Sequence, residues 1–210
     1  MGYLTIAMAK GRLEKEMIRV LQNSGMAKAF DPKSRKLIYQ DEHDRIRYMF
    51  VKPVDVVTYV EKGIADLGVV GKDVLLEQAG DVYELMDLKF GRCIFAVAGF
   101  PDTPWQSNKP LRIATKYPNI TASYFKGRDI EVTYLNGSVE LGPLIGLSEV
   151  IVDLVETGAT LKANGLVVLE EMFEISAKLI GNPASYSFKS TVINEFLKNI
   201  GDDNHDLANY

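Results

Sequence analysis

The sequence is poor in the residues that many functional sites require. It holds one cysteine, Cys93, and two histidines, His43 and His205, among 210 residues. An intrachain disulfide is therefore impossible, and a zinc site built on several cysteines is excluded. Both histidines stand between polar or charged neighbours. Neither a His-rich metal site nor a Ser-His-Asp triad is expected.

The sequence also lacks an excess of positive charge and long apolar runs. Lys and Arg number 24 against 28 Asp and Glu, which gives a formal net charge of −4 and argues against general nucleic-acid binding. No run approaches the roughly 20 apolar positions of a membrane helix. The first apolar run is about six residues long and follows no basic segment, unlike a secretory signal. We therefore expect a cytoplasmic protein that binds neither nucleic acid nor membrane.

What the sequence does contain is typical of a globular α/β protein. Hydrophobic residues make up 47% and charged residues 25% of the chain, which are ordinary values. Apolar runs alternate with stretches of helical periodicity, and this alternation predicts an α/β layer fold with parallel strands. The expected strands are 3–8, 47–51, 66–71, 82–88, 92–99, 111–115, 130–135 and 150–153.

The same pattern in both halves of the chain predicts two lobes. We expect a discontinuous first lobe of residues 1–90 and 179–200, a second lobe of residues 91–178, and a flexible tail at 201–210. Residues 166–180 show no helical stripe and are predicted to form one long strand or a strand pair. A cleft between two such lobes would be the usual place for a small-molecule site.

The most informative segment is residues 150–161. An apolar strand ends at Asp153, Glu156 follows three residues later, and the turn Thr157-Gly158-Ala159-Thr160 opens a helix. Such a turn offers backbone N–H groups and two hydroxyls, which suit a monophosphate. The carboxylates suit sugar hydroxyls or a divalent cation. The segment therefore predicts a site for 5-phosphoribosyl pyrophosphate (PRPP), the alternative being a plain helix with Thr157 as its N-cap.

Three other turns carry weaker signals. Lys10-Gly11-Arg12 follows the first strand, at the strand end where ligands bind in open α/β sheets, and its two cations suit a polyphosphate. Glu140 follows the turn Asn136-Gly137-Ser138 and is a candidate for the PRPP site. Lys72 lies after a glycine-rich strand end that lacks Walker A spacing. Each turn also has an ordinary structural interpretation, as a cap or a solvated loop.

Taken together, these segments resemble the ATP phosphoribosyltransferase family, which performs the first step of histidine biosynthesis. The resemblance spans most of residues 3–200, and its blocks are 9–13, 66–75, 114–118, 137–141 and 153–166. It implies an α/β fold of two periplasmic-binding-protein-like (type II) lobes with a cleft between them. Lys52 departs from the pattern, because many members have arginine there, and no bidentate role is expected for it.

The resemblance also implies a reaction and its residues. ATP and PRPP, with Mg²⁺, would give N1-(5-phosphoribosyl)-ATP and pyrophosphate. Catalysis would consist mainly of positioning the substrates and neutralising the leaving group, and no general base is indicated. The PRPP-binding residues would be Glu140, Asp153, Glu156, Thr157, Gly158, Ala159 and Thr160. Lys10, Gly11, Arg12 and Lys72 would bind ATP, with Lys10 and Arg12 also catalytic.

The chain resembles the short form of this family, which lacks a C-terminal regulatory domain. Short forms work with a histidyl-tRNA-synthetase-like regulatory subunit, so a homodimer within a hetero-oligomer is expected. Two rival functions stay open. A non-catalytic two-lobed binding protein should carry a secretory signal. A nucleobase phosphoribosyltransferase usually has adjacent acids, whereas Leu154 and Val155 separate Asp153 from Glu156.

Overall fold

The chain forms two compact units, each built around its own sheet. The computed structural model describes residues 2–28, 30, 31, 35–107 and 109–201. Unit 1 takes the chain up to Gly91 and again from Ser176, and unit 2 is Arg92–Ile175. The chain re-enters unit 1 at Ser176 rather than at the expected residue 179, because β11 already pairs with β4 from Ala177 onward.

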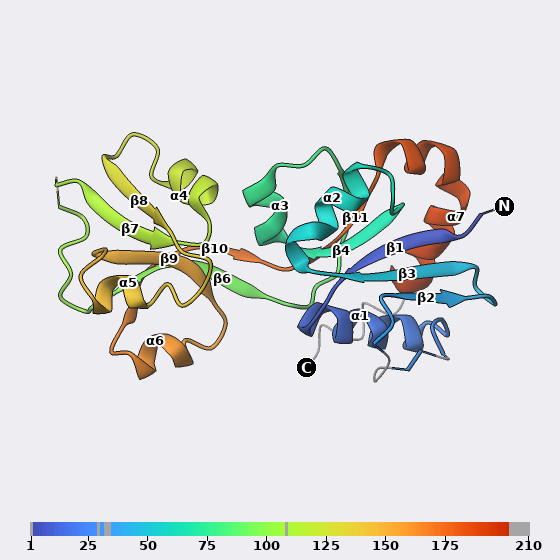
Figure 1. The fold of residues 1–210 in the computed structure, drawn as a ribbon, viewed down its shortest axis with the longest axis horizontal. Coiled ribbons are helices and arrows are strands. Elements are labelled where there is room, and N and C mark those ends of the chain that lie inside the picture. The colour runs from blue at the N-terminus through green and yellow to red at the C-terminus, as the bar shows by residue number, and fades with distance from the viewer. Residues whose placement is uncertain (1, 29, 32–34, 108, 202–210) are drawn as a thin grey trace. The chain divides into compact units, whose positions relative to one another are not determined.

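Unit 1 contains a six-stranded sheet in the order β2-β3-β1-β4-β11-β5 (Figure 1). Its strands are β1 Leu4–Ala9, β2 Ile38–Asp41, β3 Ile46–Val51, β4 Leu67–Gly71, β5 Tyr83–Asp87 and β11 Ala177–Gly181. β1 pairs in parallel with β3 and β4, whereas the remaining pairs are antiparallel. The prediction of parallel strands is thus right only for the centre of the sheet. The outer pairs differ because β2 and β3 form a hairpin and β11 follows β10 without a helical crossover.

Helices cover both faces of this sheet. The helix α1 (Arg12–Asn23) and the helix α7 (Pro183–Gly201) bury side chains against one face. The short helix η1 (Pro53–Asp55) leads into α2 (Val56–Glu61), which packs with α3 (Lys72–Gln78) on the other face. Every residue of β1 is buried, as expected of a central strand covered on both sides.

Unit 2 contains a five-stranded sheet in the order β10-β6-β9-β7-β8. Its strands are β6 Cys93–Gly99, β7 Leu111–Thr115, β8 Ile130–Tyr134, β9 Val150–Val155 and β10 Val167–Ile175. β7 pairs in parallel with β8 and β9, whereas β6 is antiparallel to β9 and β10. One face packs against α4 (Pro118–Tyr124), and the other against α5 (Leu141–Leu144) and α6 (Ala159–Ala163).

Two further expectations concern the C-terminal third of the chain. Residues 166–180 contain two successive strands, which was one of the two predicted possibilities. β10 belongs to unit 2 and β11 to unit 1. Of the expected tail, Gly201 ends α7, and residues 202–210 lie outside the described residues. No helix in the described ranges combines the length and apolar character needed to cross a bilayer.

Asp87 ties together the two segments through which the chain leaves and re-enters unit 1. Its carboxylate accepts hydrogen bonds from the Ser176 hydroxyl at 2.7 Å and the Lys89 N–H at 2.9 Å, and Lys178 Nζ lies 3.0 Å from Oδ2. Burial disfavours the charged carboxylate, but these donors outweigh burial and hold the pKa of Asp87 well below its usual range.

We expect Asp87→Asn to make the free energy of unfolding less sensitive to acid. A carboxyl whose pKa is lower in the folded state stabilises the fold above its unfolded pKa of about 3.9 and loses that contribution as the pH falls through its folded pKa. The free energy of unfolding of the wild type should therefore fall more steeply than that of Asp87→Asn between about pH 5 and pH 2.

Urea titrations across this pH range measure the difference. Asp81 is an exposed aspartate of the same unit, so Asp81→Asn is the matched control and should keep the wild-type slope. Equal slopes in the wild type and Asp87→Asn would contradict the assigned role.

Candidate functional site

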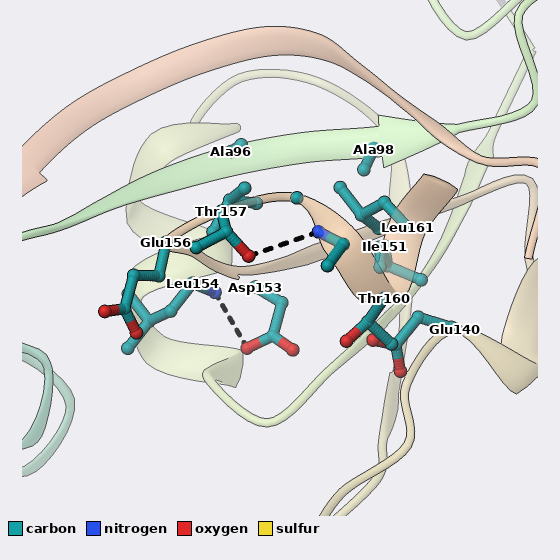
Figure 2. Close-up of a pocket in the computed structure, with 13 residues that line it drawn as sticks. Ala96, Ala98, Glu140, Ile151, Asp153, Leu154, Glu156, Thr157, Thr160 and Leu161 are labelled. Carbon is teal, nitrogen blue, oxygen red and sulfur yellow. Dashed lines mark hydrogen bonds between the residues drawn. The ribbon is translucent and has the colours of Figure 1, made fainter. Parts of the chain in front are cut away.

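A pocket of about 220 Å³ opens at the carboxyl end of β9 in unit 2 (Figure 2). It is lined by the end of β9, the 156–160 loop, the start of α6, two alanines of β6 and one acid that precedes α5. The lining includes all seven residues that the sequence predicted for PRPP: Glu140, Asp153, Glu156, Thr157, Gly158, Ala159 and Thr160. Two motifs that are separate in the sequence thus meet in one cavity.

The alternation of side chains along β9 places Asp153 in this pocket. Val152 packs into the core beneath α4, whereas Ile151 belongs to the apolar cluster on the opposite face. Because side chains alternate along a strand, Asp153 lies on the face of Ile151. Ala96 and Ala98 on β6 stand opposite Asp153 and Ile151 in the antiparallel register. Their small side chains leave room beside the carboxylate.

Three carboxylates are distributed along the pocket. Figure 2 shows Glu156 at one end, Glu140 beside Thr160 at the other, and Asp153 between them. Asp153 Oδ1 accepts a hydrogen bond from the Leu154 N–H at 2.8 Å. Carboxylates in these positions favour a ligand with hydroxyl donors or a cation. An anionic group of a ligand would be accepted only on the other side of the pocket, where backbone N–H groups are exposed.

The 156–160 loop supplies that side. Gly158 is the N-cap of α6 and has a φ of 68°, a left-handed conformation that glycine adopts readily. The Thr157 hydroxyl accepts from the Ala159 N–H at 3.3 Å, so Thr157 supports the turn without being the N-cap. In the described part of the chain, no hydrogen bond uses the N–H of Thr157 or Gly158. These two donors are therefore open to an anion.

Glu140 is held in place by its neighbours in sequence. Val139 is 1% exposed and packs in the same apolar cluster as Ile151. The Leu141 N–H donates to the Ser138 carbonyl at 3.0 Å, closing a turn around Glu140. The buried valine and the turn together direct the acid toward the pocket.

In unit 1, three lysines follow three adjacent strand ends. The parallel strands β3, β1 and β4 lie side by side and end at Val51, Ala9 and Gly71. The residues that follow these ends are Lys52, Lys10 and Lys72. Lys52 received no role from the sequence. It lies directly after β3, beside the strand that is followed by Lys10.

Two details modify the expected roles of the other residues in unit 1. The Gly11 N–H donates to Glu14 Oε2 at 3.1 Å, so this N–H serves the first turn of α1. The φ of 109° at Gly11 gives the glycine a conformational role. Arg12 is the first residue of α1 and is exposed. Lys72 opens α3 and forms an ion pair with Glu84.

Lys10 also lines a second pocket, of about 360 Å³ and entirely within unit 1. The other lining residues are Glu14, Phe30, Asp31, Arg35, Lys36, Tyr39 and Phe50. Burial raises the pKa of Tyr39, whose ring meets that of Phe30 edge to face at 5.5 Å. Arg35, Lys36 and the aromatic rings around them were not predicted as site residues from the sequence. In the sequence, the available signal was the closeness of Arg35 and Lys36 to the aromatic residues Phe30 and Tyr39.

Within the ranges that the structure describes, no three His, Cys, Asp or Glu side chains gather so as to hold a metal ion.

Comparison with known proteins identifies the family. The family model described as "HisG: ATP phosphoribosyltransferase" matches residues 52–202. The chain belongs to the ATP phosphoribosyltransferase family. The ATP phosphoribosyltransferase of Clostridioides difficile is 55% identical over 201 residues, which cover 94% of this chain and 97% of that protein. That of Bacillus subtilis is 50% identical over 196 residues, 91% of each chain.

Solved structures agree with this assignment. One chain of the ATP phosphoribosyl transferase (HisG:HisZ) complex from Thermotoga maritima has a TM-score of 0.84 and 36% identity, covering 97% of this chain and 99% of that one. The aliphatic sulphonate binding protein SsuA of Escherichia coli has a TM-score of 0.60 at 14% identity, covering 97% and 73%. SsuA shares the fold alone, and the predicted periplasmic-binding-protein-like fold of type II is confirmed.

We expect Gly142→Ala to destabilise this member of the family. A Cβ at Gly142 would lie 2.5 Å from Ser148 Oγ and 2.7 Å from Ala114 Cβ, and both neighbours are buried. Overpacking of this kind costs about 1–3 kcal/mol. Gly137→Ala is the control, because no atom lies within 4 Å of the added Cβ. Thermal unfolding compares the two variants, and an unchanged Tm for Gly142→Ala would contradict the packing around α5.

Proposed function

We propose that this chain joins N1 of the adenine of ATP to the anomeric carbon of PRPP and releases pyrophosphate, the first step of histidine biosynthesis. The observation that carries the proposal is the pocket at the end of β9, where two acids and a phosphate-type loop meet. Membership of the ATP phosphoribosyltransferase family supports the same reaction.

The pocket of unit 2 would bind the 5-phosphoribosyl group. The N–H groups of Thr157 and Gly158, with that of Thr160 in the first turn of α6, would donate to the 5-phosphate. Ala159 would line the site, with its own N–H held by the Thr157 hydroxyl. The Thr160 hydroxyl adds a further donor, and the exposed Glu156 contributes mainly its backbone.

Glu140 and Asp153 would accept hydrogen bonds from the ribose hydroxyls. Both carboxylates are half-buried and line the pocket. Ionised acceptors make stronger hydrogen bonds to hydroxyl groups than neutral acceptors do. The two acids therefore orient the anomeric carbon while the loop holds the phosphate.

The cations of unit 1 would stabilise the leaving pyrophosphate. In the reaction, the lone pair of N1 forms the new bond to carbon, and the bond from carbon to the pyrophosphate oxygen breaks with its electron pair. Negative charge grows on the pyrophosphate, so fixed cations lower the barrier. We assign this role to Lys10 and Arg12, and we assign ATP phosphates to Lys72 and the Lys10-Gly11-Arg12 turn.

The pocket also fits a magnesium ion carried by the substrate. Mg²⁺ prefers oxygen ligands and is commonly held by one or two carboxylates together with substrate phosphates. Glu140 and Asp153 are carboxylates of this kind, and no closed metal site exists among the described residues. When bound, Mg²⁺ would supply positive charge beside the pyrophosphate.

A regulatory partner and a cytoplasmic location complete the proposal. The Thermotoga maritima relative is part of a HisG:HisZ complex. We infer that this chain likewise assembles with a HisZ-like subunit, as a homodimer within a hetero-oligomer. ATP and PRPP are cytoplasmic metabolites, which is consistent with action in that compartment.

A product assay distinguishes the proposed reaction from the nearest rival. The protein is incubated with PRPP and Mg²⁺ and with either ATP or a free base (adenine, guanine or uracil). Pyrophosphate release from PRPP in the presence of ATP, and not in the presence of a free base, supports the proposal. Turnover of a free base without ATP would make the protein a nucleobase phosphoribosyltransferase.

We expect Asp153→Ala to lower kcat/KM for PRPP about 10- to 150-fold. The estimate follows from the loss of a charge-assisted hydrogen bond worth about 1.5–3 kcal/mol, at about 1.4 kcal/mol per decade. Asp153→Asn should lose less, because its amide oxygen still accepts a hydrogen bond. Melting temperatures are measured on the same samples, and wild-type kinetics in a folded Asp153→Ala would remove the ribose-binding role.

We expect the isolated chain to have low activity and no response to histidine. Addition of a HisZ-like subunit should raise the activity and make it sensitive to histidine. Steady-state assays with and without the subunit test this, and strong inhibition of the isolated chain by histidine would contradict it.

A further inference from the structure

Thr115 is the last residue of β7, is completely buried and has no part in the proposed chemistry. We propose that Thr115 is the positioning residue of the PRPP pocket, and that its hydroxyl sets the orientation of the peptide that carries Asp153. This inference deepens the proposed function and rests on it for the role of Asp153.

The first link runs from Thr115 to Asp153. Thr115 and Val152 are partners in the parallel register of β7 and β9. The Thr115 hydroxyl donates to the Val152 carbonyl at 2.7 Å. That carbonyl belongs to the planar peptide between Val152 and Asp153, so its direction also fixes the N–H of Asp153. The hydroxyl therefore controls the strand at the residue where it enters the pocket.

A second link runs from Thr115 toward Glu140. The Thr115 carbonyl accepts from the Leu135 N–H at 2.9 Å, directly after β8 ends. Residues 135–140 then lead to Glu140, with Val139 buried at the far end. One buried residue thus holds the strand end that carries Asp153 and the start of the loop that carries Glu140.

The hydroxyl of Thr115 is also engaged as an acceptor. The Tyr117 N–H donates to Thr115 Oγ1 at 2.9 Å. A threonine hydroxyl has one proton to donate, and Thr115 gives it to Val152. Removal of the hydroxyl would leave a buried carbonyl and a buried N–H without this partner. Unpaired buried groups are costly, so we expect the end of β9 to move until both find new partners.

A neighbouring threonine provides a matched control. Thr121 is also fully buried, and its hydroxyl donates to the Tyr117 carbonyl at 2.7 Å. It lies 3.5 Å from Thr115 Oγ1 but forms no bond to Val152 or Leu135. Loss of the Thr121 hydroxyl should therefore affect stability without moving β9.

The experiment compares Thr115→Val, Thr115→Ser and Thr121→Val. Melting temperature and PRPP affinity by calorimetry are measured on the full chain. Thr115→Val removes the hydroxyl at nearly constant shape, and we expect PRPP binding to weaken about tenfold or more. Thr115→Ser keeps the hydroxyl and should bind PRPP with near wild-type affinity. Thr121→Val should lower the melting temperature and leave PRPP affinity unchanged.

Amide hydrogen exchange at Leu154 gives a readout that does not depend on the ligand. The Leu154 N–H donates to the Asp153 carboxylate, so displacement of Asp153 should speed its exchange. We expect faster exchange in Thr115→Val and wild-type exchange in Thr121→Val. If Thr115→Val does not fold, Thr115→Ala takes its place in both measurements.

The outcomes separate this inference from the proposed function. PRPP affinity and Leu154 exchange that match those of Thr121→Val would overturn the positioning role. Faster exchange with unchanged PRPP affinity would overturn it as well, provided that Asp153→Ala weakens PRPP binding. If Asp153→Ala itself leaves PRPP binding intact, the ribose-binding role of Asp153 fails, and Leu154 exchange alone decides whether Thr115 positions the strand.

Discussion

The register of β9 between β6 and β7 is the constraint on which the pocket of unit 2 depends. β9 pairs with a strand on each side, and both ladders set Ile151 and Asp153 on one face. A slip by one residue would turn Asp153 into the core beneath α4 and bring Val152 into the pocket. The apolar residues on both faces prevent such a slip. Each face packs in a different apolar core, and a slip would move every side chain of β9 from one core to the other.

Local conformation then refines what the register places. Gly158 adopts a left-handed φ that turns the chain from β9 into α6, and the turn leaves the N–H groups of Thr157 and Gly158 without partners in the described chain. Ala96 and Ala98 keep the opposite side of the cavity open. The pocket therefore combines anion donors on the loop with acceptors on the strand, which matches a ligand that carries both a phosphate and hydroxyl groups.

In unit 1 as well, strand pairing brings side chains from distant parts of the sequence together, here at the parallel centre of the sheet. The strands β3, β1 and β4 run in one direction, so the residues after their carboxyl ends come to one edge. Lys52, Lys10 and Lys72 occupy these positions, from parts of the sequence that are far apart. Glu84 pairs with Lys72, and Glu14 accepts from the Gly11 N–H. The edge is thus basic, with part of its donor capacity already used.

The sequence by itself determined the α/β class, the two-lobed organisation and the strand-and-turn segment that lines the pocket of unit 2, because strand periodicity and turn chemistry are local properties. It did not reveal the antiparallel outer strands, the acceptor of the Gly11 N–H, the N-cap at Gly158, or Arg35 and Tyr39 beside Lys10. Those features depend on which strands pair and on how loops pack. Glu140 was expected from the family resemblance to share a site with Asp153, but the two acids line one cavity only because β7 pairs with β9 and Val139 is buried. Such contacts between distant segments are decided by packing of the whole unit, and no local pattern encodes them.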